Sequence, residues 1–285
     1  MRQTQEGILI RFATMQDTPA VIRLWETCFP GDTVFQNYFF AHLYVPEYNL
    51  LLFRNDVLCA MAQMLPYRMQ DGWKTETVTY IYGACTHPDY RRQHLMDTLL
   101  HHTFMLDRQM GRTASVLIPQ EEWLFGFYAQ FGYEAVLSVS VDEYHAALGA
   151  ECCPLRAMVP EDLSGMDALY HAALPEGAYL CRDEAEWKKQ LDLFTHCGGG
   201  AFCTGAEGAP EGYAFVWHTK QEGLWAQELC APGKTMQFAG ALMAHFGVKK
   251  CRATGLSFSQ KQLLGCVLRH DGACPTDGYI NLMLN

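Results

Sequence analysis

Residues 87–100, HPDYRRQHLMDTLL, place a proline turn, two arginines and a glutamine directly before an amphipathic segment. A helix N-terminus presents unpaired backbone N–H groups and the positive end of the helix dipole. Phosphate groups bind at such a terminus, and arginine side chains strengthen the binding. We therefore expect a diphosphate to bind here, held by Arg91, Arg92 and Gln93 and by the backbone amides of the first helical turn (His94, Leu95, Met96 and Asp97).

The segment just before this corner, YGACT at 82–86, has a glycine within a run of β-branched and aromatic residues. Glycine inside a strand indicates a bulge or the close approach of another chain. An extended ligand that carries amides could pair with Ala84, Cys85 and Thr86 and place its diphosphate at the arginine corner. Coenzyme A has this shape, with an amide-bearing arm and a pyrophosphate. No Cys/His spacing fits a zinc site, so no metal is expected.

The elements around this corner alternate between strand and helix patterns. We expect turns at Asn55-Asp56 and at 71–73. In the helix after the corner, Leu95, Leu99, Leu106 and Met110 share one stripe, and Gly111 ends it. The expected strands are 7–14, 49–56, 57–69, 75–86, 113–118 and 134–144, and the expected helices are 17–29 (with Thr18 as a possible cap), 33–44, 95–110 and 121–131.

The second half of the chain repeats the opening of the first. IRFATMQDTPAVIRLWETCFP (10–30) aligns without a gap with LRAMVPEDLSGMDALYHAALP (155–175), and ACTHP (84–88) corresponds to ELCAP (228–232). This indicates an internal duplication with its boundary in ALGAECCP (147–154). We expect two domains, 1–146 and 154–285, of which the first binds acetyl-CoA and the second is degenerate, with a structural or acceptor-site role.

The corner resembles the acetyl-CoA motif of the GCN5-related N-acetyltransferase (GNAT) superfamily. That motif has small glycines where Arg92, His94 and Met96 stand, so we expect helical backbone angles through this loop, which need no glycine. FYAQFGY (127–133) resembles a second motif of the superfamily. The tandem arrangement is similar to the first two domains of the enhanced-intracellular-survival acetyltransferases. The implied fold class is α/β, with two tandem GNAT-like domains, each a twisted mixed sheet flanked by helices.

The resemblance implies an acetyl-CoA-dependent N-acetyltransferase that moves an acetyl group to a primary amine of a small molecule or peptide by direct attack on the thioester. Tyr128 would be the acid for the departing thiolate, and N–H groups near Cys85 and Thr86 would polarise the carbonyl. The sequence names no general base. The first two helices would shape the acceptor pocket, with Trp25, Phe29 and Tyr38 as candidate contacts; packing against the sheet is the other role open to these rings.

The second half lacks these features. At the position of the corner it has APGKTMQFAG (231–240), with Lys234 as the one charge, and we expect a last helix around LLGCVLRHDG (263–272) without the tyrosine. We therefore expect that it does not bind CoA and instead supports or covers the acceptor site. Related tandem enzymes often self-associate, so a homo-oligomer is a possible assembly.

The net charge and the hydrophobic pattern of the sequence indicate which classes of partner and which compartment to expect. A formal charge of −10 argues against nucleic acid or an anionic membrane as the main partner. No apolar run is long enough to span a membrane, and the N-terminus lacks a secretory signal, so we expect a cytoplasmic protein with reduced cysteines. Two alternative functions remain open: a non-catalytic CoA-binding sensor or partner-binding module, and a tRNA-dependent aminoacyl transferase of the cell-wall type, which the acidic charge disfavours.

Overall fold

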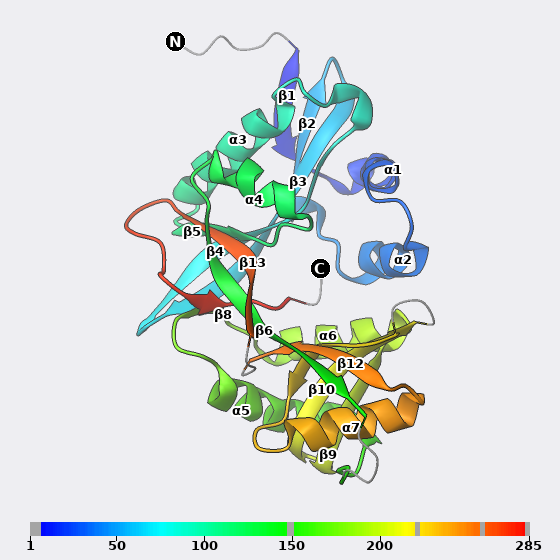
Figure 1. Cartoon of the computed structure of the whole chain (residues 1–285). Coiled ribbons are helices and arrows are strands. Elements are labelled where there is room, and N and C mark those ends of the chain that lie inside the picture. Colours follow the sequence, from blue (N-terminus) through cyan, green and yellow to red (C-terminus); the bar gives the residue numbers. More distant parts are fainter. Residues whose placement is uncertain (1–6, 147–150, 220–222, 257–259, 283–285) are drawn as a thin grey trace. The chain divides into compact units, whose positions relative to one another are not determined.

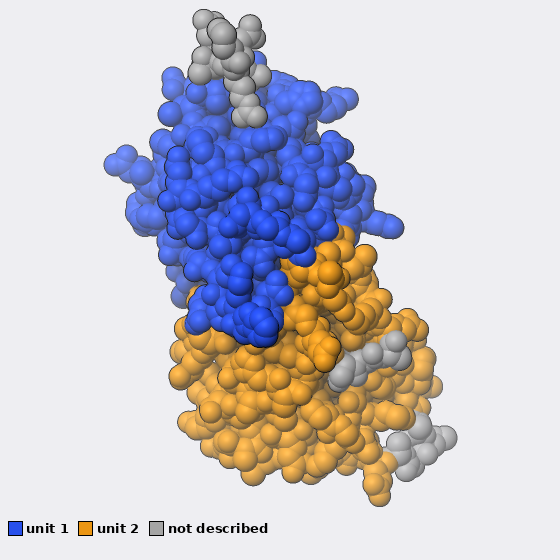
Figure 2. All heavy atoms as spheres, turned by 90° about the vertical axis from the view of Figure 1, so that its left-hand side faces the viewer, with its two compact units in different colours: residues 1–134, 266–274 blue, residues 135–265, 275–285 orange. Residues whose placement is uncertain are grey.

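The computed structural model describes residues 7–146, 151–219, 223–256 and 260–282. The chain divides into two compact units, and each is discontinuous in sequence (Figure 2). Unit 1 consists of residues 1–134 and 266–274, and unit 2 of residues 135–265 and 275–285. The domain bounds expected from the sequence, 1–146 and 154–285, stay a prediction, and part of the expected boundary (147–150) lies outside the described residues.

Unit 1 is a mixed sheet with helices on both faces (Figure 1). Its strands lie in the order β1-β2-β3-β4-β5, and residues 266–269 of β13 pair antiparallel with β5. Its elements are β1 (Ile8–Phe12), η1 (Met15–Asp17), α1 (Thr18–Cys28), α2 (Thr33–His42), η2 (Pro46–Tyr48), β2 (Asn49–Arg54), β3 (Val57–Asp71), β4 (Lys74–Thr86), η3 (Pro88–Tyr90), α3 (Leu95–Gln109), β5 (Ala114–Leu117) and α4 (Glu122–Ala129).

Unit 2 has strands in the order β6-β12-β11-β10-β9-β7, and β14 pairs with both β6 and β8. Its elements are β6 (Glu134–His145, of which Glu134 is assigned to unit 1), β7 (Arg156–Ala157), η4 (Pro160–Asp162), α5 (Leu163–Ala173), β8 (Ala178–Leu180), α6 (Glu184–His196), β9 (Gly200–Ala206), β10 (Ala209–Thr219), β11 (Gly223–Cys230), α7 (Thr235–Phe246), β12 (Lys250–Gly255), β13 (Gln260–Arg269, shared with unit 1) and β14 (Gly278–Tyr279). No helix in the part of the chain that the structure describes is long and apolar enough to cross a membrane.

The aligned openings of the two halves share one local construction. In unit 1 the guanidinium of Arg11 donates to both carboxylate oxygens of Asp17 at 2.8 Å, and in unit 2 Arg156 holds Asp162 in the same way at 2.6 and 2.8 Å. Each aspartate also accepts the backbone N–H three residues earlier, at 2.8 and 3.0 Å. A strand, a 3-10 turn and an 11-residue helix therefore follow one another in both halves.

Two local turn predictions are confirmed. Asn55 and Asp56 form the two-residue turn between β2 and β3 with positive φ angles of 47° and 63°, which asparagine and aspartate tolerate best among residues other than glycine. Gly72, with φ at 56°, lies in the turn between β3 and β4.

Three expectations about helices are wrong. Residues 263–269, expected in a helix, lie in β13, where Cys266 and Val267 are buried. Thr18 is the first residue of α1, and Asp17, not Thr18, is its N-cap. Met110 is 47% exposed and follows the last residue of α3, whose buried stripe runs through Leu95, Leu99, Leu100 and Phe104.

Candidate active site

The strands β4 and β5 separate at the point where the sequence predicted a ligand. The two strands pair in parallel over Val78–Tyr80 and Ala114–Val116, whereas β4 continues to Thr86. His87 N–H donates to Cys59 O at 2.8 Å beside the Ala60–Thr86 pair. That pair is therefore of the non-hydrogen-bonded kind, so the N–H and C=O of Thr86 point away from β3. Beyond its paired segment, β4 offers main-chain groups on the side of β5.

The glycine in this strand forms the predicted bulge. Pairing between β3 and β4 shifts register between Met61 and Gln63, and Gly83 has φ at +57°. A Cβ at Gly83 would lie 2.5 Å from the ring of Trp25, closer than real contacts allow. Both the backbone angle and the packed ring therefore require glycine here. Ala84, Cys85 and Thr86 follow directly at the end of β4.

The loop that connects β4 to α3 contradicts the expected helical angles. Arg92 and His94 have φ at 61° and 58°, in the left-handed region that is unfavourable for L-residues with a Cβ. These are the positions at which the resembled motif has glycine. The chain therefore keeps the loop conformation although the glycines are absent. Successive N–H groups in alternating right- and left-handed conformation form a concavity that binds anions.

The side chains of the loop support its shape. Arg91 Nε donates to Thr86 O at 3.2 Å, and the Arg91 side chain also hydrogen-bonds Cys28. Gln93 Nε2 donates to Asp89 O at 3.3 Å, and Gln93 Oε1 accepts from Arg54. His94 Nδ1 contacts Asp97 Oδ2 at 2.7 Å on the outside of the first turn.

The first turn of α3 presents its backbone rather than its side chains to this loop. Leu95 is 1% exposed and belongs to the core between α3 and the sheet, and Met96 packs against the same core. Their side chains thus point into unit 1. The predicted cofactor contacts on β4, in the loop and on the first turn of α3 are therefore adjacent along the chain and continuous in space.

Tyr128 lies on α4 with an 8% exposed side chain. Burial raises the pKa of its hydroxyl to about 12, with smaller contributions from Cys266 on β13 and Cys85 on β4. Cys85 lies on β4, at the separation from β5, and Cys266 lies on β13 on the other side of β5, where it pairs with Leu117 at the end of that strand. The tyrosine is therefore protonated at neutral pH and near the end of the predicted ligand path.

Two thiols meet beside this strand. Cys28, at the end of α1, contacts Thr86 O through its sulfur at 3.5 Å. The hydrogen bond between Cys28 and Cys85, together with the charge of Arg91, lowers the pKa of Cys28. Burial raises the pKa of Cys85 well above its usual value, which keeps this thiol protonated and weakly nucleophilic.

The aromatic residues of α1 and α2 pack mainly against one another. Trp25 is 6% exposed and lies 4.9 Å from Phe29, 5.3 Å from Phe39 and 5.7 Å from Tyr82, measured between ring centroids. Tyr38 lies beside His42 at 4.8 Å. Trp25 and Phe29 are thus brought together next to the bulge at Gly83.

Unit 2 differs at the corresponding strands. Its parallel pair β11–β12 shifts register after Ala226–Ala253 but pairs again at Leu229–Gly255, near the ends of both strands. Glu228, at the position that aligns with Ala84, is buried in a bidentate ion pair with Arg182 at 2.6 and 2.8 Å. Two tyrosine hydroxyls also donate to Glu228, at 2.9 Å each. A saturated polar network thus occupies the region that is open in unit 1.

Sequence reasoning missed the amides of Asn49 and Gln63, the thiol of Cys28, and the Arg182–Glu228 pair. Asn49, Gln63 and Glu228 lie in strands, and their polarity there was the one available signal, since polar groups in a buried strand are expected to have a specific partner. Cys28 lies at the end of α1 and Arg182 lies between β8 and α6, so neither gave this signal.

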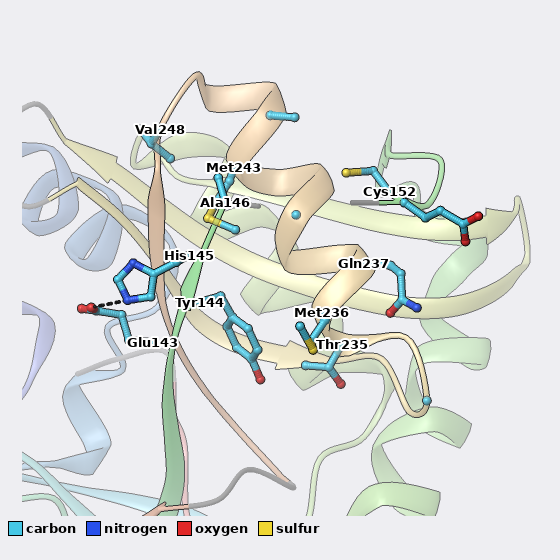
Figure 3. Close-up of a pocket in the computed structure, with 14 residues that line it drawn as sticks. Glu143, Tyr144, His145, Ala146, Cys152, Thr235, Met236, Gln237, Met243 and Val248 are labelled. Carbon is cyan, nitrogen blue, oxygen red and sulfur yellow. Dashed lines mark ion pairs between the residues drawn. The ribbon is translucent and has the colours of Figure 1, made fainter. Parts of the chain in front are cut away.

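A cavity of about 890 Å³ lies in unit 2 (Figure 3). It is lined mostly by apolar groups of α7 and the end of β6, among them Tyr144, Met236 and Met243, and by the Glu143–His145 ion pair at 3.1 Å. It contains none of the predicted site residues.

Residues 9–136 match the family model of the acetyltransferase (GNAT) domain. No curated protein sequence matches the chain. Among solved structures, the chain resembles a GCN5-related N-acetyltransferase from Anabaena variabilis (TM-score 0.72, 17% identity, 93% of this chain and 73% of that one). It also resembles a probable N-acyltransferase from Enterococcus faecalis (0.72, 13%, 92% and 72%) and Eis1 from Mycobacterium abscessus (0.64, 13%, 92% and 74%). The likeness confirms the predicted fold, and the domain match supports an acyltransferase.

Proposed function

We propose, from the match of residues 9–136 to the acetyltransferase (GNAT) domain model, that unit 1 transfers the acetyl group of acetyl-CoA to a primary amine of a small molecule or peptide. The observation that carries the proposal is the separation of β4 from β5 directly before the left-handed loop and the N-terminus of α3. GNAT domains use acetyl-CoA in general, and these three features suit its amide arm and its diphosphate.

In this proposal the main chain of β4 holds the pantetheine arm. Thr86 offers its N–H on the open side, and Ala84 and Cys85 border the acetyl group. The N–H groups of residues 92–97, with Arg91 beside them, hold the diphosphate at the positive end of α3. The side chains of Arg92, Gln93 and His94 are exposed, which is compatible with binding through the backbone.

Tyr128 supplies the proton for the leaving group. The neutral amine attacks the thioester carbonyl, a C–N bond forms and the C–S bond breaks. The Tyr128 hydroxyl donates its proton to the departing sulfur, and the proton lost by the amine nitrogen restores the hydroxyl. A pKa of about 12 keeps the hydroxyl protonated until charge develops on sulfur.

We further propose that unit 2 does not bind CoA and serves the acceptor side or the structure. The β11–β12 pairing, which resumes at Leu229–Gly255, and the buried Glu228 support this, because an extended ligand would have to break a saturated ion-pair network.

The test is thermal stability with and without acetyl-CoA. Ligand at about 100 times its Kd should stabilise the wild type by about 2.7 kcal/mol. Arg91→Glu should lose most of this shift because it places a negative charge beside the diphosphate. Arg68→Glu makes the same charge change at an exposed position on β3 and should keep it.

The outcomes separate the alternatives. A shift that Arg91→Glu abolishes and Arg68→Glu retains, followed by acetylation of an amine panel, supports the transferase. A shift without acetylation of any amine would favour a CoA-binding module. No shift at millimolar acetyl-CoA would refute both.

A further inference from the structure

Two buried amides form a row across the sheet of unit 1. Asn49 of β2 pairs with Gln63 of β3, and Gln63 pairs with Tyr82 of β4. Directly paired residues present their side chains on the same face of a sheet. That face carries α1 and α2, since the ring of Tyr82 lies 5.7 Å from that of Trp25. The row of Asn49 and Gln63 therefore lies under the aromatic helices.

Most of the polar atoms in this row have no partner. Asn49 is 0% exposed and Gln63 is 1% exposed. Asn49 Nδ2 donates to Tyr44 OH at 3.2 Å, but Asn49 Oδ1 and both polar atoms of Gln63 are buried without a hydrogen-bond partner. Buried polar groups are nearly always paired with protein or with ordered water, so three orphaned atoms on neighbouring strands require a polar partner that is not another protein group.

The row is next to the proposed reaction centre. A Cβ built on Gly83 would lie 3.2 Å from Gln63 Nε2 and 2.5 Å from the ring of Trp25. The Gln63 amide is therefore at the β4 bulge, directly before Ala84 and Cys85. Trp25 lies against the same bulge, and because the row is fully buried, binding of a ligand there requires surrounding side chains such as this ring to move.

The unpaired atoms of Asn49 and Gln63 suit a primary amine better than an anion as their ligand. Two of the three are carbonyl oxygens, which accept N–H donors but are too weakly basic to take a proton. The rings of Trp25 and Tyr82 add faces that attract an amine in its charged form. A carboxylate or phosphate would find one donor and two repelling oxygens in the row.

We propose that Asn49 and Gln63 bind the acceptor amine and present it to the thioester at the Gly83 bulge. This inference rests on the proposed acetyl transfer, because the amine would be its acceptor. Binding of the amine can nevertheless be measured whether or not acetyl transfer occurs. Asn49 Oδ1 and Gln63 Oε1 accept the N–H groups of the amine and hold its nitrogen without protonating it.

The experiment uses the full chain and two probes, methylamine and 2-phenylethylamine, with 2-phenylethanol as the analogue without an amine. The side-chain amide signals of ¹⁵N-labelled protein are followed by NMR, and the Gln63 signal is identified by its loss in Gln63→Met. Amine affinity is measured for the wild type, Gln63→Met and Gln190→Met. Gln190 is a matched control, because it is a buried glutamine of unit 2 whose Oε1 also has no partner.

We expect an amine to shift the Gln63 signal, 2-phenylethanol to leave it in place, and Gln63→Met to weaken amine binding at least tenfold. Gln190→Met should bind the amine as the wild type does. Gln63→Met should keep its affinity for acetyl-CoA and melt no lower than the wild type, because methionine fits a similar volume and has no unpaired amide. A merely structural glutamine would not produce this combination of results.

Two results would overturn the inference: no shift of the Gln63 signal with either amine, or equal amine affinity in Gln63→Met and the wild type. A buried water would then be the partner of the row. Acetyl-CoA titrations on the same samples report separately on the proposed function. If acetyl-CoA does not bind, acetyl transfer fails as a proposal, whereas the amine titration still decides the role of the row.

Discussion

Replacement of Arg92 by glycine should stabilise the protein, although it deletes a whole side chain. Arg92 is exposed and has φ at 61°. An L-residue in the left-handed region costs about 1–2 kcal/mol. Glycine removes this cost but loses about 0.5–1 kcal/mol more backbone entropy on folding. The expected net gain in the free energy of unfolding is therefore about 0.5–1 kcal/mol.

His94→Gly should gain less. His94 has the same kind of backbone angle, with φ at 58°, but its ring also contacts Asp97 at 2.7 Å, and both side chains are substantially exposed. Exposed ion pairs contribute about 0–1 kcal/mol, which offsets much of the relief. The free energy of unfolding should therefore rise clearly in Arg92→Gly and change little in His94→Gly.

Urea denaturation of the protein without ligand measures these differences. Arg92→Ala is the first control, because it removes the side chain but keeps the unfavourable angle, and it should be less stable than Arg92→Gly by about 1 kcal/mol. Arg91→Gly is the second, because Arg91 has φ at −65° and should lose about 0.5–1 kcal/mol through backbone entropy, in addition to its hydrogen bond to Thr86 O. If Arg92→Gly is no more stable than Arg92→Ala, the strain argument is refuted.

Three further predictions follow from the site and the fold. Tyr128→Phe should lower the rate of acetyl transfer about 10²–10⁴-fold and leave acetyl-CoA affinity unchanged, and a variant as fast as the wild type would exclude the hydroxyl as the acid. Asp162→Asn should lower the free energy of unfolding more than Asp17→Asn does, because the Asp162 side chain is 0% exposed and that of Asp17 is 13% exposed. The expected losses, measured in parallel urea melts, are about 3 kcal/mol for Asp162→Asn and about 1 kcal/mol for Asp17→Asn. Stability should fall as pH rises above 10, because burial raises the pKa values of several tyrosines in the folded state, Tyr128 to about 12. The other tyrosines whose pKa burial raises include Tyr80, Tyr133, Tyr213 and Tyr279. Because the unfolded chain releases these protons at lower pH than the folded chain, the melting temperature should fall. A melting temperature that stays level from pH 9 to 11 in calorimetry would contradict this.

Local chemistry determined what the sequence could predict. The turn at Asn55-Asp56 and the repeated arginine–aspartate pairs depend on residues at most six positions apart. Patterns of this length are visible in the sequence. The start of α3 behind a basic loop was predictable for the same reason. The bulge at Gly83 was indicated by the glycine itself, although its partners Met61–Gln63 and Trp25 are distant in sequence.

Long-range pairing determined what could not be predicted. The run around Cys266 is apolar and short, and its periodicity does not distinguish a strand from a buried helix. It is a strand because Cys266 and Leu117 pair with each other from distant parts of the chain. The loop angles at Arg92 and His94 were missed because neither residue favours positive φ by itself, and the row of Asn49 and Gln63 exists only once three strands are in register.

The pairing of β5 with β13 has a consequence for biosynthesis. β5 and its partner strand are about 150 residues apart, which at roughly 5–20 residues per second means about 8–30 s of translation. Until then the nascent chain holds β5 with one unpaired edge, a template for association with other chains. A gene cut after residue 134 would leave this edge permanently open. The sheet that begins in the first half of this polypeptide is therefore expected to stay incomplete until the ribosome has synthesised β13 near the end of the chain.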